Sequence, residues 1–148
     1  MNVLVTLGTT PFNELLRAID EQQIDQKTIL TVQAIGESSF NFNNSFEFSS
    51  DIQHWYDWAD VVITHAGAGS IYRLLEQDKK IIVVPNTFRK DKHQLDIAKY
   101  VEENCYGSVC YELSEITNCL EKAAEFSVKP YNKTEFSGAS DISEALFG

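Results

Sequence analysis

The chain has few cysteines and few positive charges, and both shortages exclude classes of protein. Its three cysteines, Cys105, Cys110 and Cys119, lack the spacing of a zinc site and are an odd number for a disulfide framework. We therefore expect reduced thiols, as in a cytosolic protein. Against 22 Asp and Glu there are 12 Lys and Arg, which leaves a net charge of −10. This charge argues against binding nucleic acid or docking alone on an anionic membrane, because both require positive charge.

Long apolar runs are also missing. No stretch approaches the about 20 residues that span a bilayer. The apolar residues 3–7 are too few, and the residues before them carry too little charge, for a signal peptide. The 148 residues are 43% hydrophobic and 11% aromatic, which indicates a folded globular chain. We expect one cytoplasmic domain over residues 1–148, without an internal repeat or an interdomain linker.

What the chain does have is an alternation of strand and helix patterns. Such alternation is typical of a parallel sheet covered on both faces, so we predict an α/β fold. It would be a single Rossmann-like domain with about six parallel strands. Asp51 has the position of an N-cap for the helix that follows it. The strands are expected at residues 2–7, 28–35, 47–48, 61–64, 80–84 and 108–111, and the helices at 12–21, 52–59, 70–77, 91–104 and 114–126. The polar tail ends in a short amphipathic segment, 142–147, suited to docking.

A glycine turn follows the strand at residues 61–64. Gly67 and Gly69 lie between this strand and a helix, so backbone N–H groups at the helix N-terminus can face an anion. Three more loops, at residues 8–10, 49–50 and 86–94, also follow predicted strands. Because ligands of such sheets bind at the carboxyl ends of the strands, the four loops predict one binding site. The alternative is that these glycines only permit tight turns.

Two other kinds of enzyme fit the pattern poorly. The first glycine loop lacks the G-x-G-x-x-G sequence of NAD-binding enzymes, and no acidic residue ends a suitable second strand. No cysteine lies near a strand-end loop that carries a histidine, which disfavours a cysteine nucleophile.

Three segments resemble a known family. They are residues 58–60 (Trp-Ala-Asp), 65–70 (His-Ala-Gly-Ala-Gly-Ser) and 91–94 (Asp-Lys-His-Gln), with support from residues 5–12. Together they resemble the carboxyl-terminal, donor-binding half of family 28 glycosyltransferases, a GT-B group that includes MurG. The chain looks closer to two free-standing forms of that half. One is the PssE type of exopolysaccharide and capsule synthesis, and the other is the catalytic subunit of the eukaryotic dolichol-linked GlcNAc transferase.

The resemblance implies a role for each loop in binding a UDP-sugar. Phe48 and Ser49 match the loop that reads the uracil ring, and His93 and Gln94 match positions that contact the donor sugar. His65 either approaches the phosphates, as a catalytic candidate, or closes the turn. The diphosphate would lie on a set of small residues, namely Ala66, Gly67, Ala68, Gly69 and Ser70, with help from Gly8, Thr9 and Thr10.

One position departs from the family pattern. Arg73 stands where relatives carry a glutamate for the ribose diol. Glu76, one helical turn further on, replaces it only if the helix is rotated. Either the ribose contact is lost or weaker here, or Arg73 has a new role, such as pairing with a partner subunit.

The resemblance also implies chemistry that one lobe cannot complete. The family is metal-independent and inverting, the chain has no Asp-x-Asp pair, and no cofactor is expected beyond the UDP-sugar. The acceptor site and the base belong to the other lobe, which this chain lacks. We therefore expect a membrane-anchored partner of the PssD type that presents a lipid-linked acceptor and holds this chain at the membrane. A non-catalytic enhancer of such a partner is the alternative. The donor sugar, whether glucose, galactose or GlcNAc, is left open.

Overall fold

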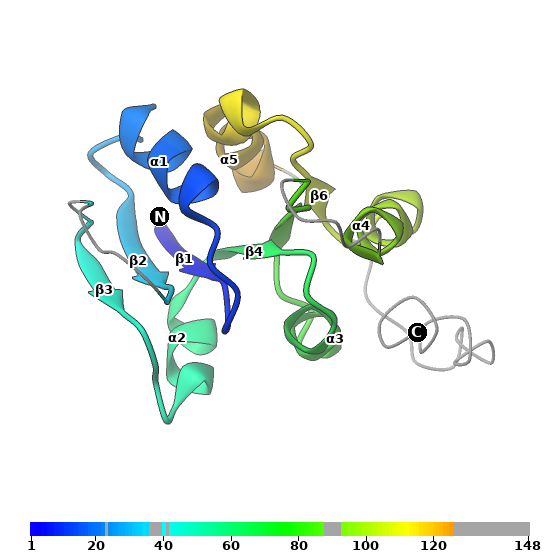
Figure 1. Ribbon diagram of the computed structural model, residues 1–148, viewed down its shortest axis with the longest axis horizontal. Helices are drawn as coiled ribbons and strands as arrows, with labels where there is room; N and C mark the ends of the chain where they lie inside the picture. Colours follow the sequence, from blue (N-terminus) through cyan, green and yellow to red (C-terminus); the bar gives the residue numbers. More distant parts are fainter. Residues whose placement is uncertain (23, 36–39, 41, 88–92, 126–148) are drawn as a thin grey trace.

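The fold is described by a computed structural model, which covers residues 1–22, 24–35, 40, 42–87 and 93–125 (Figure 1). The predicted docking segment at 142–147 and part of the predicted loop at 86–94 lie outside these residues. Within the described part of the chain, no helix is long and apolar enough to cross a membrane.

In the described residues, six parallel strands form one sheet, in the order β3-β2-β1-β4-β5-β6. The predicted number and direction of the strands are therefore confirmed. The strands are β1 (Asn2–Thr6), β2 (Ile29–Gln33), β3 (Asn44–Phe46), β4 (Val61–His65), β5 (Ile81–Val84) and β6 (Ser108–Val109). From β1 the chain runs outward to β3 and then returns to β4 on the other side of β1. This reversal makes a switch point beside β1, where ligands of open α/β sheets bind.

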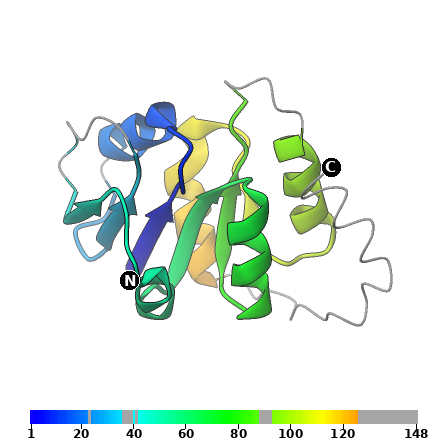
Figure 2. The same ribbon diagram turned by 60° about the horizontal axis from the view of Figure 1, so that its bottom comes forward.

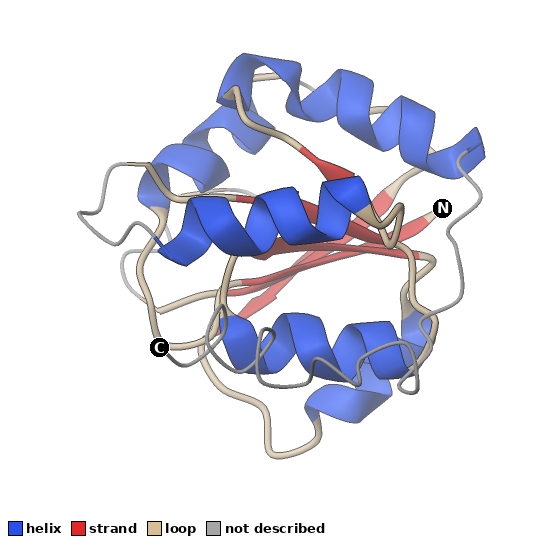
Figure 3. Ribbon diagram, turned by 90° about the vertical axis from the view of Figure 1, so that its right-hand side faces the viewer, coloured by secondary structure: helices blue, strands red, loops and turns tan. Residues whose placement is uncertain are grey.

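Helices cover both faces of the sheet (Figure 3). They are α1 (Asn13–Glu21), α2 (Ile52–Trp58), α3 (Ala68–Glu76), α4 (His93–Glu103) and α5 (Ile116–Glu125), with a 3-10 turn η1 (Leu113–Glu115) before the last. Alternate side chains of β1 enter two separate cores, as its pleat requires. Val3 and Val5 pack in the core under α1 and α5, whereas Leu4 packs in the core under α2, α3 and α4. Figure 2 shows α3 in front of the sheet and α5 behind it.

Most expected boundaries hold to within a few residues, and two differ in a way that affects the site. The third strand was expected at Glu47 and Phe48, which is wrong: it is Asn44–Phe46, and Glu47 and Phe48 follow it. Pairing decides the position, because Asn44 lies beside Thr31 of β2. The third helix begins at Ala68 rather than Ser70.

The N-terminus of α2 was correctly predicted. The Asp51 carboxylate accepts a hydrogen bond from the His54 backbone N–H at 3.2 Å, as an N-cap does. This cap sets where the β3–α2 loop ends and the helix begins.

Candidate functional site

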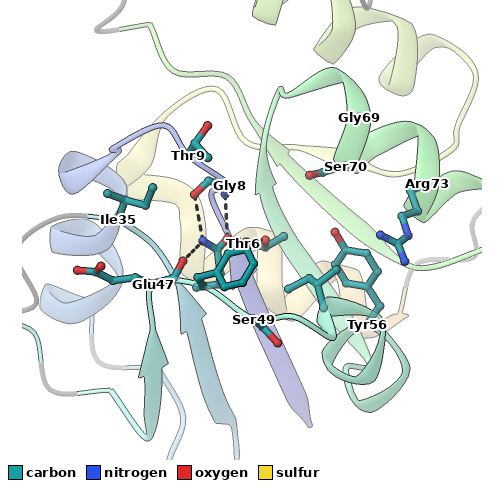
Figure 4. A pocket seen from close by; sticks show the side chains of 13 residues that line it. Thr6, Gly8, Thr9, Ile35, Glu47, Ser49, Tyr56, Gly69, Ser70 and Arg73 are labelled. Carbon is teal, nitrogen blue, oxygen red and sulfur yellow. Dashed lines mark hydrogen bonds between the residues drawn. The ribbon is translucent and has the colours of Figure 1, made fainter.

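A pocket of about 480 Å³ opens at the carboxyl ends of β1 and β2 (Figure 4). Its volume lies within the range of small-molecule sites. The β1–α1 loop, the β3–α2 loop and the first turns of α2 and α3 form its walls. The lining residues are Thr6, Gly8, Thr9, Gln33, Ile35, Glu47, Phe48, Ser49, Ile52, Tyr56, Gly69, Ser70 and Arg73. The predicted switch point thus has a cavity of ligand size.

The base of this pocket is built around the carboxamide of Gln33. Its Oε1 accepts hydrogen bonds from Thr6 Oγ1 at 2.9 Å, from Leu7 N at 3.1 Å and from Gly8 N at 2.8 Å. Its Nε2 donates to Gly8 O at 3.0 Å and to Glu47 O at 2.8 Å. The side chain is only 6% exposed. Sequence reasoning missed Gln33, although an amide at the end of an otherwise apolar strand was a usable signal.

Gly8 is in a backbone conformation that favours glycine. Its φ is +58°, in the left-handed region that side chains disfavour. This turn places Gly8 and Thr9 on the pocket wall, while the Thr10 N–H bonds back to Leu7 O at 3.2 Å and closes the loop. Gly8 and Thr9 thus line the pocket and Thr10 is not among its lining residues, while their contact with a donor stays a prediction.

The imidazole of His65 lies against the turn between β4 and α3. A Cβ built on Gly67 would be 2.5 Å from His65 Cε1 and 2.7 Å from Nε2. A Cβ on Gly8 would be 3.8 Å from the same Nε2. His65 therefore packs beside both loops without lining the pocket. This position explains a role in shaping the turn, and a catalytic role for His65 stays a prediction.

The N-terminus of α3 faces the pocket through Gly69 and Ser70. Gly67 precedes the helix with an extended backbone, and its carbonyl accepts from Ile71 N at 3.2 Å. The N–H groups of the first helical turn have no partner within the helix itself and carry the positive end of its dipole. A Cβ on Gly69 would meet nothing within 4 Å, so this side of the turn is open.

Arg73 lines the pocket from α3 but is held by α2. Its Cζ lies 5.6 Å from the centroid of the Tyr56 ring, close enough for a cation–π contact. Its Nη2 donates to Gln53 Oε1 at 3.3 Å, and Gln53 is also bonded to Gln77. Among the lining residues that the structure describes, Arg73 is the one with a cationic side chain. These contacts of Arg73 lie within the chain, so a weaker ribose contact and pairing with a partner both stay predictions.

Some predicted site residues do not reach the pocket. Glu76 is exposed at the end of α3, and Gln94 is 6% exposed with its Oε1 accepting from Asn86 N at 2.6 Å. This bond ties the start of α4 to the chain after β5. The pocket brings together Gly8, Thr9, Phe48, Ser49, Gly69 and Ser70, and its described lining does not include Thr10, His65, Ala66, Gly67, Glu76, His93 or Gln94. The side chain of Ala68 lies outside the described part of the structure.

Residues 2–146 match the family model of the glycosyltransferase family 28 C-terminal domain. The chain belongs to this family. The human UDP-N-acetylglucosamine transferase subunit ALG13 is 27% identical over 144 residues, which cover 86% of this chain. That match covers 12% of the human protein, so the chain spans a small part of this relative.

Two solved structures share the fold of this family 28 domain. The NMR solution structure of ALG13 gives a TM-score of 0.67 at 22% identity and covers 99% of this chain and 97% of that one. The calicheamicin glycosyltransferase CalG4 gives a TM-score of 0.65 at 17% identity, covering 99% of this chain and 39% of that one. The predicted fold, a Rossmann-like carboxyl-terminal half of a GT-B glycosyltransferase, is confirmed.

The family 28 domain shows no clustered metal ligands in the part of the chain that the structure describes, where no three His, Cys, Asp or Glu side chains come together. Of the pocket-lining residues within the described ranges, Glu47 is the acidic one. The first turn of α3 and Arg73 border the same pocket.

Cys110 and Cys119 form a thiol pair away from the pocket, in the core under α1 and α5. All three cysteines are free thiols. The hydrogen bond from the Cys110 thiol lowers the pKa of Cys119 to about 7. The same hydrogen bond, together with burial, raises the pKa of Cys110. Cys119 is thus the more acidic member of the pair.

Proposed function

We propose that this family 28 domain binds a UDP-sugar and is the catalytic, donor-binding subunit of a two-chain, metal-independent, inverting glycosyltransferase. The observation that carries the proposal is the pocket at the switch point, bounded by the N-terminus of α3 and by the loop with Phe48 and Ser49. A helix N-terminus suits a diphosphate. The loop across the pocket suits the uracil ring, as the resemblance to the family implies.

The donor is proposed to lie across the pocket from loop to loop. The uracil contacts the backbone at Phe48 and Ser49, and the diphosphate contacts Gly69, Ser70 and the Gly8 loop. The donor sugar extends toward His93 and Gln94 at the start of α4. Since Gln94 Oε1 is bonded to Asn86 N, its sugar contact is proposed through Nε2.

The proposed donor sugar is GlcNAc. The similarity to the human UDP-N-acetylglucosamine transferase subunit ALG13 supports this choice over glucose or galactose. In the reaction, an acceptor hydroxyl attacks the anomeric carbon, the bond from that carbon to the diphosphate oxygen breaks, and UDP leaves. The helix N-terminus stabilises the leaving diphosphate. His65 is kept as the candidate catalytic residue of this chain.

A second chain is proposed to complete the enzyme. It is membrane-anchored, supplies the base and presents a lipid-linked acceptor for glycan or exopolysaccharide synthesis, as a PssD-like subunit does. The net charge of −10 favours a partner with a basic face. This family 28 domain would then be located at the membrane through its partner.

A non-catalytic enhancer is the second candidate function. Arg73 favours this function. Its guanidinium contacts Tyr56 and Gln53, and, unlike the glutamate of relatives, it cannot accept hydrogen bonds from the ribose hydroxyls. An enhancer would stabilise a partner that binds the donor itself. UDP binding by this chain distinguishes the two candidates.

A thermal-shift titration tests the proposed function. UDP and UDP-GlcNAc should raise the melting temperature in proportion to saturation, with and without EDTA, while GDP and NAD should not. UDP-glucose and UDP-galactose test the choice of sugar. Gly69→Leu fills the open side of the turn and should abolish the shift. Glu121→Leu, an exposed change on α5, is the matched control and should keep it. No shift with any UDP compound would reject donor binding by this chain and favour the enhancer.

A further inference from the structure

We infer that Gln33 is a positioning residue that sets the spacing between the two loops of the pocket, so that both ends of a nucleotide are held at once. This inference rests on the proposed function and assigns a role that neither motif nor resemblance indicated. Gln33 lies at the end of β2, between the β1–α1 loop and the β3–α2 loop.

One planar carboxamide connects the two loops. On one side Gln33 bonds both backbone groups of Gly8, accepting from its N–H at 2.8 Å and donating to its carbonyl at 3.0 Å. On the other side it donates to Glu47 O at 2.8 Å, one residue before the exposed Phe48. The distance from the Gly8 loop to the Phe48 loop is therefore fixed by the length of a single side chain.

The chemistry of the contact requires an amide. Three donors converge on Oε1 and two carbonyls face Nε2, so both amide hydrogens of Gln33 are used. No carboxylate, hydroxyl or apolar side chain of this length supplies both functions. Because Gln33 is 6% exposed, water does not readily replace a lost bond.

Figure 4 shows why this spacing bears on a ligand. Gly8 and Thr9 lie on one loop and Glu47 on the other, and the hydrogen bonds of Gln33 to Gly8 and Glu47 connect the two. Under the proposed function, the Gly8 loop contacts the diphosphate and the Phe48–Ser49 loop contacts the uracil. A ligand that spans both loops gains from their correct separation, whereas a ligand that touches one loop does not.

The test compares UDP with its two halves. Kd values for UDP, uridine and pyrophosphate are measured by NMR titration on the unaltered chain and on Gln33→Glu. This variant keeps the acceptor oxygens but cannot donate to Gly8 O and Glu47 O. We expect UDP binding to weaken at least about tenfold, while uridine and pyrophosphate change less than about threefold, because each half still fits its own loop.

Gln22→Glu is the matched control. Gln22 also bridges distant segments, donating to Leu113 O at 2.7 Å and accepting from Thr117 N at 3.2 Å, under the opposite face of the sheet. It should lower stability without changing the ratio of UDP to uridine affinity. Gln33→Met removes all five hydrogen bonds while keeping the length of the side chain. It should reduce the ratio of UDP to uridine affinity further than Gln33→Glu does. It also replaces Gln33→Glu in the test if that variant does not fold.

Three results would overturn the inference. If Gln33→Glu weakened the binding of UDP, uridine and pyrophosphate equally, Gln33 would have a general structural role. If the ratio of UDP to uridine affinity were unchanged in both Gln33 variants, the spacing of the loops would be set by other residues. In both cases UDP binding by the unaltered chain would leave the proposed function standing. Absence of UDP binding by the unaltered chain would overturn the proposed function together with this inference.

Discussion

Replacing Gly67 by alanine should destabilise the domain because of one side chain, His65. The new Cβ would lie 2.5 Å from His65 Cε1 and 2.7 Å from Nε2, distances that real Cβ atoms do not show. The backbone of Gly67 is at φ −87° and ψ 132°, which alanine adopts without strain. The penalty is therefore steric, and overpacking of this kind costs about 1–3 kcal/mol.

Gly69→Ala is the matched control, two residues away. A Cβ there meets nothing within 4 Å, and Gly69 lies inside α3. Alanine is favoured over glycine within a helix by up to about 1 kcal/mol. We expect Gly69→Ala to be neutral or stabilising, so that the free energies of unfolding of the two variants differ by about 2 kcal/mol, as the steric and helical contributions together imply.

Urea denaturation of four chains checks the cause. They are the unaltered chain, Gly67→Ala, His65→Ala and the double variant, which form a double-mutant cycle. Removing the imidazole should abolish most of the Gly67→Ala penalty, since no ring remains for the Cβ to meet. The reasoning would be refuted if Gly67→Ala were as stable as the unaltered chain, or if its penalty were the same with and without His65.

Three further predictions concern stability and thiol chemistry. Asp51→Ala should lower the free energy of unfolding by about 1 kcal/mol through loss of the α2 cap, as measured by urea denaturation, and an unchanged value would contradict the cap. Gly107→Ala places a Cβ 2.5 Å from Ile81 Cγ1 and 2.9 Å from Ile81 O, so thermal unfolding should show a clear loss; a variant as stable as the unaltered chain would disprove the contact. Alkylation of Cys119, followed by mass spectrometry, should rise with pH through about 7, since the thiolate reacts and its pKa is lowered by Cys110. In Cys110→Ala the midpoint should move up toward 9.0, and an unmoved midpoint would show that the hydrogen bond is not the cause.

The fold was predictable because its signals are local. The residues of Val61–His65 and Ile81–Val84 are mostly apolar, and this composition alone predicts buried strands. Each strand is followed by a helical pattern. In a parallel sheet the carboxyl ends of the strands meet at one edge. That rule brought Gly8 and Gly69 to the same pocket although they lie far apart in sequence.

What could not be predicted depends on contacts between distant residues. The edge strand Asn44–Phe46 contains polar residues of low strand propensity, so only its pairing with β2 places it. The role of Gln33 follows from partners at Gly8 and Glu47, 25 and 14 residues away, which no periodicity reports. Gln94 is a similar case, since its bond to Asn86 N becomes visible only once α4 is placed.

An NMR titration of the isotope-labelled chain with UDP-GlcNAc tests the central proposal most directly. If the pocket binds the donor, amide signals of Gly8, Phe48, Ser49, Gly69 and Ser70 should shift together and saturably. Signals of α5, on the opposite face of the sheet, should stay unchanged. Shifts absent from these residues, or clustered on α5, would contradict the assignment of this pocket as the donor site.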